Sequence, residues 1–184
     1  MLIEHEREKL KNAVLFFAGR VRFLGKTKLF KLLYFLDFEH YRDTGRSVTG
    51  IEYFAWKMGP VPVELYNEIK QDTTWESCIN LERITTAKGH EMTAVRPIGE
   101  FQATHFSKRE LRIMESLSRK YEKADAEDMV EETHLENLPW HQVYVVDNKK
   151  QHHIPYELAL RKQEIELMLA EINDRNELVS AIKG

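Results

Sequence analysis

The chain has 184 residues, 42% of them hydrophobic and 31% charged, and its 27 basic and 30 acidic residues give a net charge of −3. This length and composition are those of an ordinary globular protein, so we expect a single domain over residues 1–184. The closely mixed charges lack the basic footprint of a typical nucleic-acid-binding protein and disfavour that class.

Cys78 is the only cysteine, so the chain alone can form neither an internal disulfide nor a thiolate zinc site. The first residues are charged and lack the apolar stretch of a signal peptide. No apolar run is long enough to span a membrane. We therefore expect a cytoplasmic protein that makes no membrane contact.

The first predicted element is a helix over about residues 4–19. Its apolar residues recur at the spacing of a stripe that faces a core, namely Leu10, Ala13, Val14, Phe17 and Ala18. Gly25 then separates this helix from the next. Five cations surround the junction and form either a small basic patch or, as we favour, a solvated surface: Arg20, Arg22, Lys26, Lys28 and Lys31.

A second helix is predicted over residues 28–41 and on to about Thr44, because neither glycine nor proline interrupts this leucine-rich stretch. Apolar side chains surround almost the whole helix, which is typical of a helix enclosed by other elements. We expect the remaining strip to face water, and it carries Lys28, Lys31, Glu39 and Arg42 with Phe35 among them. Gly45 favours a left-handed C-cap.

Asp37 and His40 lie on the apolar side of this helix, three residues apart and therefore adjacent. Such a pair can be a buried polar contact that pins one element to another, a partner-binding feature, or an acid–base pair. We favour the structural role, because burying either group alone is costly.

Further along, residues 51–56 predict a short strand, and Met58 to Pro62 a stiff turn. A helix from Pro62 to about Gln71 should bury Leu65 and Ile69. Two strands, over residues 79–84 and 92–97, flank Lys88-Gly89 and predict a β-hairpin.

In the last part of the chain, Ser107 and Glu110 have the spacing of a capping box. A helix should follow, with Leu111, Met114, Leu117 and Tyr121 as its apolar stripe. A shorter helix over about residues 125–135 should end at Pro139-Trp140. Residues 147–153 predict a loop, and a final helix should extend from about Tyr156 to Ser180 with one densely charged face. The fold class is α+β and predominantly helical: a central buried helix wrapped by other helices, with a short strand and a β-hairpin.

No pattern in the chain indicates catalysis. Neither a glycine-rich phosphate loop nor a G-x-S-x-G elbow is present, and Cys78 has no local activating signature. The histidines at 134, 141, 152 and 153 lack a spacing that would bring them to one metal. We expect no catalytic residues, metal or cofactor, and hence a protein that is not an enzyme.

Three segments together resemble the Panacea domain of the SocA-like antitoxin family, which also has phage-associated members. They are residues 28–41, residues 45–50 and the Gly-Pro-Val-Pro segment at 59–62, in the order and at the spacing of the family pattern. His134 with Pro139-Trp140 is similar to a later element of the family. The resemblance is strongest over residues 25–69.

The resemblance implies an antitoxin of a toxin–antitoxin system, which neutralises a cognate toxin protein by direct binding. Two alternatives are a proteolytic adaptor that delivers the toxin to an ATP-dependent protease, and a phage-derived protein that binds nucleic acid. A homodimer is a further option. On this basis the expected partner-binding residues are Lys31, Tyr34, Asp37, Tyr53, Trp56, Pro60 and Trp140. The helix from about residue 156 is expected to be a partner-binding extension.

Overall fold

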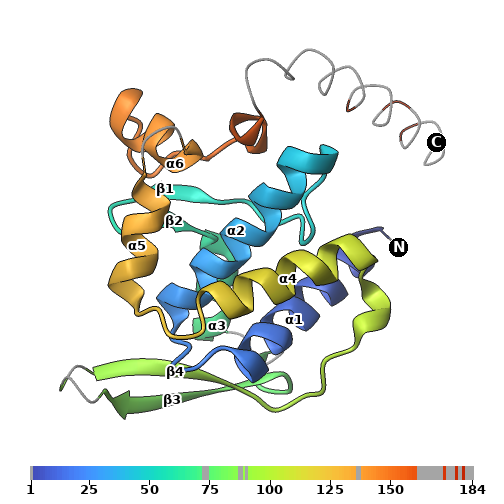
Figure 1. The fold of residues 1–184 in the computed structure, drawn as a ribbon, viewed down its shortest axis with the longest axis vertical. Helices are drawn as coiled ribbons and strands as arrows, with labels where there is room; N and C mark the ends of the chain where they lie inside the picture. The colour runs from blue at the N-terminus through green and yellow to red at the C-terminus, as the bar shows by residue number, and fades with distance from the viewer. Residues whose placement is uncertain are drawn as a thin grey trace.

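The fold is built around α2 (Lys26–Thr44), which runs through the middle of the molecule (Figure 1). The structure is a computed structural model that describes residues 2–71, 75–86, 89, 91–135, 138–160 and the separate positions 172, 177 and 180. Every residue of α2 from Lys28 to Phe38 is buried. Gly45 ends the helix with φ 65°, and its N–H donates to the carbonyl of Tyr41 at 2.7 Å, as expected of a left-handed C-cap.

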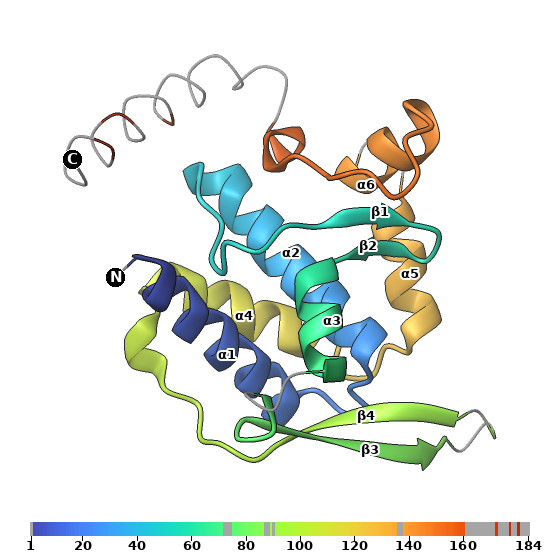
Figure 2. The same cartoon turned by 180° about the vertical axis from the view of Figure 1, so that it is seen from behind.

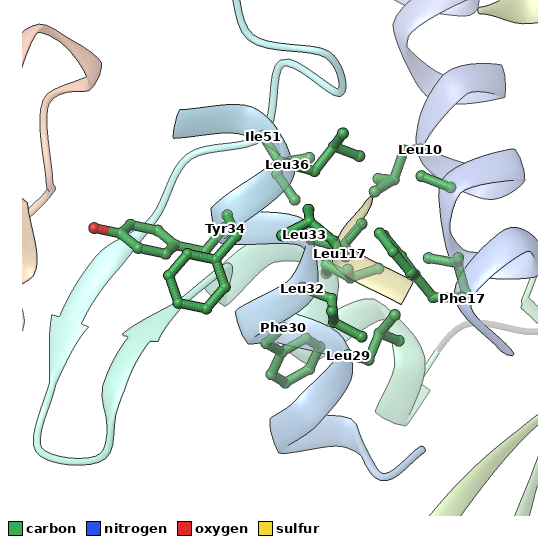
Figure 3. Close-up of a cluster of buried hydrophobic side chains, with 14 of the residues drawn as sticks. Leu10, Phe17, Leu29, Phe30, Leu32, Leu33, Tyr34, Leu36, Ile51 and Leu117 are labelled. Atoms are coloured by element: carbon green, nitrogen blue, oxygen red, sulfur yellow. The ribbon is translucent and has the colours of Figure 1, made fainter. Parts of the chain in front are cut away.

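Helices α1 (Leu2–Arg20) and α4 (Lys108–Lys120) lie side by side against α2. Figure 3 shows the leucines of α2 packed toward Leu10 and Phe17 of α1, with Leu117 of α4 in the same cluster. The predicted capping box of α4 is confirmed, since Ser107 and Glu110 bond to each other's backbone N–H. Lys9 of α1 also contacts Glu110, at 2.5 Å, so the cap of α4 joins the two helices.

Helix α3 (Val63–Gln71) lies in front of α2 in Figure 2, on the side away from α4, and buries Leu65 and Ile69, as predicted. Helix α5 (Ala126–His134) also packs against α2. Its N-cap Asp125 forms a second capping box with Asp128. The short α6 (Pro139–His141) follows and continues as a π-helical turn over Gln142–Val146. Pro139 and Trp140 therefore begin a helix, whereas the sequence predicted only that they end one.

Two antiparallel hairpins complete the described part of the fold. The hairpin predicted from sequence is confirmed as β3 (Ile79–Thr85) and β4 (Glu91–Pro97). The expected strand near residue 54 is β1 (Phe54–Trp56), but the segment predicted as a stiff turn forms a second strand, β2 (Gly59–Val61). The confirmed class is thus α+β and predominantly helical, with two hairpins where one hairpin and one strand were expected.

Short 3-10 turns occur at Ala103–His105 and Tyr156–Ala159. The second turn occupies the start of the predicted final helix, and most of that helix lies outside the described residues. None of the helices in the described part of the chain is long and apolar enough to cross a membrane.

Candidate functional site

The side chain of Lys31 is 1% exposed, although the sequence placed it on a water-facing strip. Its ammonium Nζ donates to the carbonyl of Pro60 in β2 at 2.8 Å. A Cβ atom built onto Gly59 would lie 2.7 Å from both this Nζ and the hydroxyl oxygen of Thr133 in α5. Gly59 also has φ +94°, so the position needs glycine for its backbone conformation as well as for its space. Lys31 thus ties α2 to β2 beside α5.

The hydrogen bond from Lys31 occupies a backbone carbonyl at the outer edge of β2. Ala55 donates its N–H to the carbonyl of His152, and its own carbonyl accepts from the N–H of Gln151, so both backbone groups of Ala55 point away from β2. The residue opposite Ala55 in the hairpin is Pro60. Pro60 must therefore point its carbonyl outward, where Lys31 donates to it. Proline has no N–H to satisfy at this edge.

Lys28 is buried as well, which corrects its placement on a solvated surface. Its Nζ donates to three backbone carbonyls, those of Ala124 at 2.6 Å, Arg22 at 3.1 Å and Glu122 at 3.4 Å. Burial lowers the pKa of Lys28, and nearby acidic groups oppose the shift. The five-residue basic patch considered from the sequence does not exist as a surface, because Lys28 and Lys31 are inside the protein.

Asp37 is a second buried hub of α2. Its Oδ1 accepts from the N–H groups of Val48 and Thr49, both at 2.8 Å, and its Oδ2 accepts from the hydroxyls of Thr49 at 2.5 Å and Tyr53 at 2.7 Å. Burial raises the pKa of Asp37, and these four donors oppose the rise. Asp37 therefore fixes the segment between α2 and β1, as the favoured structural reading predicts.

His40 does not join Asp37 in a pair. Its Nδ1 lies 2.7 Å from the carbonyl of Arg46 and 3.2 Å from the hydroxyl of Thr44. Asp37 and His40 hold different parts of the same connection, residues 44–53. The acid–base pair considered from the sequence is not formed.

Aromatic rings fill the space around these polar contacts. Tyr34 lies 4.3 Å from Phe38 and 5.5 Å from Tyr53 between ring centroids, and Figure 3 shows it on the side of α2 away from Leu10 and Phe17. Its buried hydroxyl has no hydrogen-bond partner among the described residues. Burial raises the pKa of Tyr34, and the nearby backbone N–H of Trp140 opposes the rise.

Trp140 connects this region to α5 and to the first hairpin. Its ring stacks on that of His134 at 3.7 Å between centroids, and its Nε1–H donates to the carbonyl of Trp56 at 2.9 Å. The Nε2 of His134 is buried without a partner among the described residues. Burial lowers the pKa of His134, and the positive charge of Lys31 lowers it further.

Burial lowers the pKa of Lys31 to about 7. Lys31, Tyr34 and His134 therefore form a buried polar cluster in which the neutral forms are favoured. We call it the Lys31 cluster, and it includes Gly59, Pro60, Thr133 and Trp140.

The structure brings the seven expected partner-binding residues into one region, at and around the Lys31 cluster and Asp37. Six have buried side chains: Lys31, Tyr34, Asp37, Tyr53, Pro60 and Trp140. Trp56 is half-buried, with its ring against that of Tyr66. Their role in partner binding stays a prediction. Sequence reasoning assigned no site role to Gly59, Thr49 or Thr133, although Gly59 and Thr49 lie in segments that carry the family resemblance.

The charged groups of this arrangement are occupied within the protein. Asp37 is fully engaged by four donors, and Lys31 is 1% exposed. Within the described ranges, no three His, Cys, Asp or Glu side chains gather as metal ligands.

Comparison with known proteins agrees with the geometry. Residues 29–141 match the family described as antitoxin SocA-like, Panacea domain. The match extends from Leu29 in α2 to His141 at the end of α6 and contains every residue of the Lys31 cluster. No curated protein and no solved structure matches the chain. Since the family matches more than half of the chain, this protein belongs to the SocA-like antitoxin family with a Panacea domain.

Proposed function

We propose that this protein is an antitoxin that neutralises a cognate toxin protein by direct, stoichiometric binding in the cytoplasm. The observation that carries the proposal is membership of the SocA-like antitoxin family across residues 29–141. The whole chain is proposed to act as one domain, and to bind its partner without catalysing a reaction.

The buried contacts of the family motif support this proposal. Lys31 and Asp37 use their polar atoms on the protein's own backbone and hydroxyl groups. Contacts of this kind fix the shape of a recognition domain, because a half-satisfied polar group in a core is costly.

For partner binding we assign the seven residues two kinds of role. The six buried ones hold β1, β2 and α6 in place beneath the surface, and Trp56 contributes part of its ring to that surface. Trp56→Ala should then weaken toxin binding more than it weakens the fold. Phe17→Ala offers a contrast, because Phe17 is buried in the core between α1 and α2 and its loss should lower stability first.

The decisive experiment starts with the gene next to this one. Its product should arrest growth when expressed alone, co-expression with this protein should restore growth, and the two should co-purify at a fixed ratio. A neighbour that is neither toxic nor bound would contradict the proposal. The half-life of the toxin, measured with and without this protein, should be unchanged or longer, whereas an adaptor for an ATP-dependent protease would shorten it.

The expected C-terminal extension is tested in the same assay. A chain ending at Leu160 should fold and lose part of its neutralising activity if the residues beyond 160 contact the toxin. Full neutralisation by the shortened chain would remove those residues from the proposed interface.

A further inference from the structure

The outer edge of β3 carries backbone groups that point away from the protein. Val95 of β4 donates its N–H to the carbonyl of Leu24 at 2.7 Å, so Val95 faces away from β3. Its partner across the hairpin is Leu81. In an antiparallel pair, the N–H and C=O of such a residue pair both point outward, and the pattern repeats every two residues. Ile79, Leu81, Arg83 and Thr85 therefore present their backbone groups at the open edge.

A second hydrogen bond supports this register. The N–H of Ile98 donates to the carbonyl of Cys78 at 2.8 Å, next to the pair formed by Ile79 and Pro97. No residue in the described ranges bonds to the outward backbone groups of β3. In Figure 2, β4 lies between β3 and the helices, and β3 is the outermost strand.

A pocket opens beside the first half of this edge. Its volume is about 530 Å³, and it is lined by Ile69, Lys70, Trp75, Glu76, Ile79, Asn80, Leu81 and Ile98. Ile98 is a large apolar residue that is nonetheless 58% exposed. A strand paired with Ile79 and Leu81 would thus have an apolar recess next to it.

The charges along the edge define the partner further. Glu82 is engaged by Arg96 across the hairpin at 3.3 Å. Arg83 is exposed and has no acidic partner in the described part of the chain. Arg83 and Leu81 lie on the same face of β3, because they are two residues apart. A partner strand would therefore present one side chain beside Leu81 and another, two residues away, beside Arg83.

We propose that the open edge of β3 is a docking site for an extended strand of a partner protein, which places an apolar side chain at the pocket and an acidic side chain opposite Arg83. Main-chain hydrogen bonds would supply much of the affinity, as in other cases where a strand is added to a sheet. The identification of this partner with the toxin rests on the proposed function; the strand-binding property itself does not.

Two registers in which a second copy of this chain could pair along the edge are disfavoured. Antiparallel self-pairing centred on Glu82 would set two Glu82 side chains directly opposite each other, and pairing centred on Arg83 would do the same for Arg83. Like charges in opposed positions destabilise strand pairs. In these registers the edge is better matched to a strand of different sequence, with an acidic residue opposite Arg83.

The first test uses a proline that removes only an outward donor. Leu81→Pro deletes the outward N–H of Leu81 and leaves the hydrogen bonds between β3 and β4 in place, whereas the control Leu81→Thr keeps that N–H in a strand-forming residue. We expect Leu81→Pro to bind the toxin of the adjacent gene at least tenfold more weakly than Leu81→Thr. Circular dichroism and thermal melting establish that both variants fold.

A second pair of variants does not depend on tolerance of proline. Ile98→Asp places a charge at the pocket, and Phe23→Asp places one in the loop between α1 and α2, where the side chain of Phe23 is 67% exposed. Ile98→Asp should weaken binding of the toxin at least tenfold, and Phe23→Asp should leave it unchanged. Equal binding by the wild type, Leu81→Pro and Ile98→Asp would overturn the docking site while leaving the antitoxin proposal intact.

A third measurement needs no toxin. A short synthetic strand peptide with Leu and Asp two residues apart should slow hydrogen exchange of the Ile79, Leu81, Arg83 and Thr85 amides, and the same peptide with Lys in place of Asp should do so less. Protection of these amides would support the edge even if no neighbouring toxin exists. A peptide without effect, or a wild-type dimer that Leu81→Pro dissolves without any loss of toxin binding, would contradict the proposal.

Discussion

The two hairpins of this protein differ in how their edges are treated. In β1–β2, residues 151–154 pair with the outer side of β1, and Lys31 donates to the outward carbonyl of Pro60 on β2. In β3–β4, the loop at Leu24 and Gly25 covers β4, and β3 has no partner on its outer side within the described residues. The first hairpin is closed at both edges and the second at one.

The difference suggests two roles: the β1–β2 hairpin stabilises the fold, and the β3–β4 hairpin leaves an edge available for contact with another chain. An unpaired edge invites pairing with another chain and is usually blocked when it has no use. Here the edge of β2 is blocked by its own Pro60 and by the buried Lys31 of α2, whereas β3 carries Leu81 and Arg83 at its open edge. The closed hairpin should accordingly be sensitive to substitution through stability, and the open one through binding.

The largest expected loss comes from Asp37→Ala. Removal of the carboxylate leaves the N–H groups of Val48 and Thr49 and the hydroxyls of Thr49 and Tyr53 without their acceptor. Stranding buried donors of this kind should lower the free energy of unfolding by roughly 3–5 kcal/mol. Urea denaturation measures the change, and a loss below about 1 kcal/mol would contradict the view that Asp37 fixes the approach to β1.

Two glycine substitutions compare the hairpins directly. Gly59→Ala in the closed hairpin would place a Cβ atom 2.7 Å from the Lys31 ammonium and the Thr133 hydroxyl, at a residue with φ +94°. This substitution should lower the free energy of unfolding by about 2–4 kcal/mol. Gly89→Ala, at the turn of the open hairpin, has φ +80° but no atom within 4 Å, and should cost about 1 kcal/mol. Equal melting temperatures for the two variants would show that the close packing at Gly59 is unimportant.

The stability of the closed hairpin should also depend on pH through Lys31. In the unfolded chain its pKa is near 10.5, and in the folded protein burial lowers it to about 7. Between these values the unfolded state binds more protons, so the free energy of unfolding should rise with pH by at most about 1.4 kcal/mol per unit. Below pH 7 both states are protonated and this contribution is flat.

Lys31→Met removes this dependence and supplies the control. The difference in stability between wild type and Lys31→Met should change in favour of the wild type from pH 7 to pH 9, because other groups contribute equally to both proteins. A constant difference would mean that Lys31 titrates normally in the folded protein. Above pH 10 the buried tyrosines, whose pKa values burial raises, should reduce the stability of both.

The smallest expected effect lies on the open hairpin. Glu82 and Arg96 form an ion pair with about half of each side chain exposed, and exposed pairs contribute little. Glu82→Ala should therefore change the free energy of unfolding by less than about 0.5 kcal/mol. A loss comparable to that of Gly59→Ala would remove the contrast between the hairpins.

The elements found correctly from sequence are those defined by neighbouring residues. The stripe of α1, the left-handed cap at Gly45, the capping box at Ser107 and the β3–β4 hairpin each depend on residues close in the chain. Strand β2 was missed because Pro60 and Pro62 indicate a turn when read alone. Proline is acceptable here because its missing N–H would point outward from the hairpin, and Lys31 donates to its outward carbonyl.

The candidate site was less predictable, because its polar contacts join distant parts of the chain. Lysine at a helix surface is normally solvated. The residues next to Lys28 and Lys31 in the sequence did not indicate that these lysines would donate to the carbonyls of Ala124 and Pro60. The sequence did contain one indication. A helix that is apolar almost all round leaves little surface for a charged strip, so its lysines needed acceptors inside the protein.

The placement of Lys31 and Asp37 six residues apart on α2 has a consequence for how the chain folds. Asp37 bonds to residues 11, 12 and 16 positions later, and Lys31 to a residue 29 positions later. Lys28 reaches Ala124, which is 96 positions away. Short chain closures form faster than long ones, so α2 and the first hairpin should assemble early and α5 should dock late. Substitutions at Asp37 should then slow refolding, and substitutions at Lys28 should mainly speed unfolding.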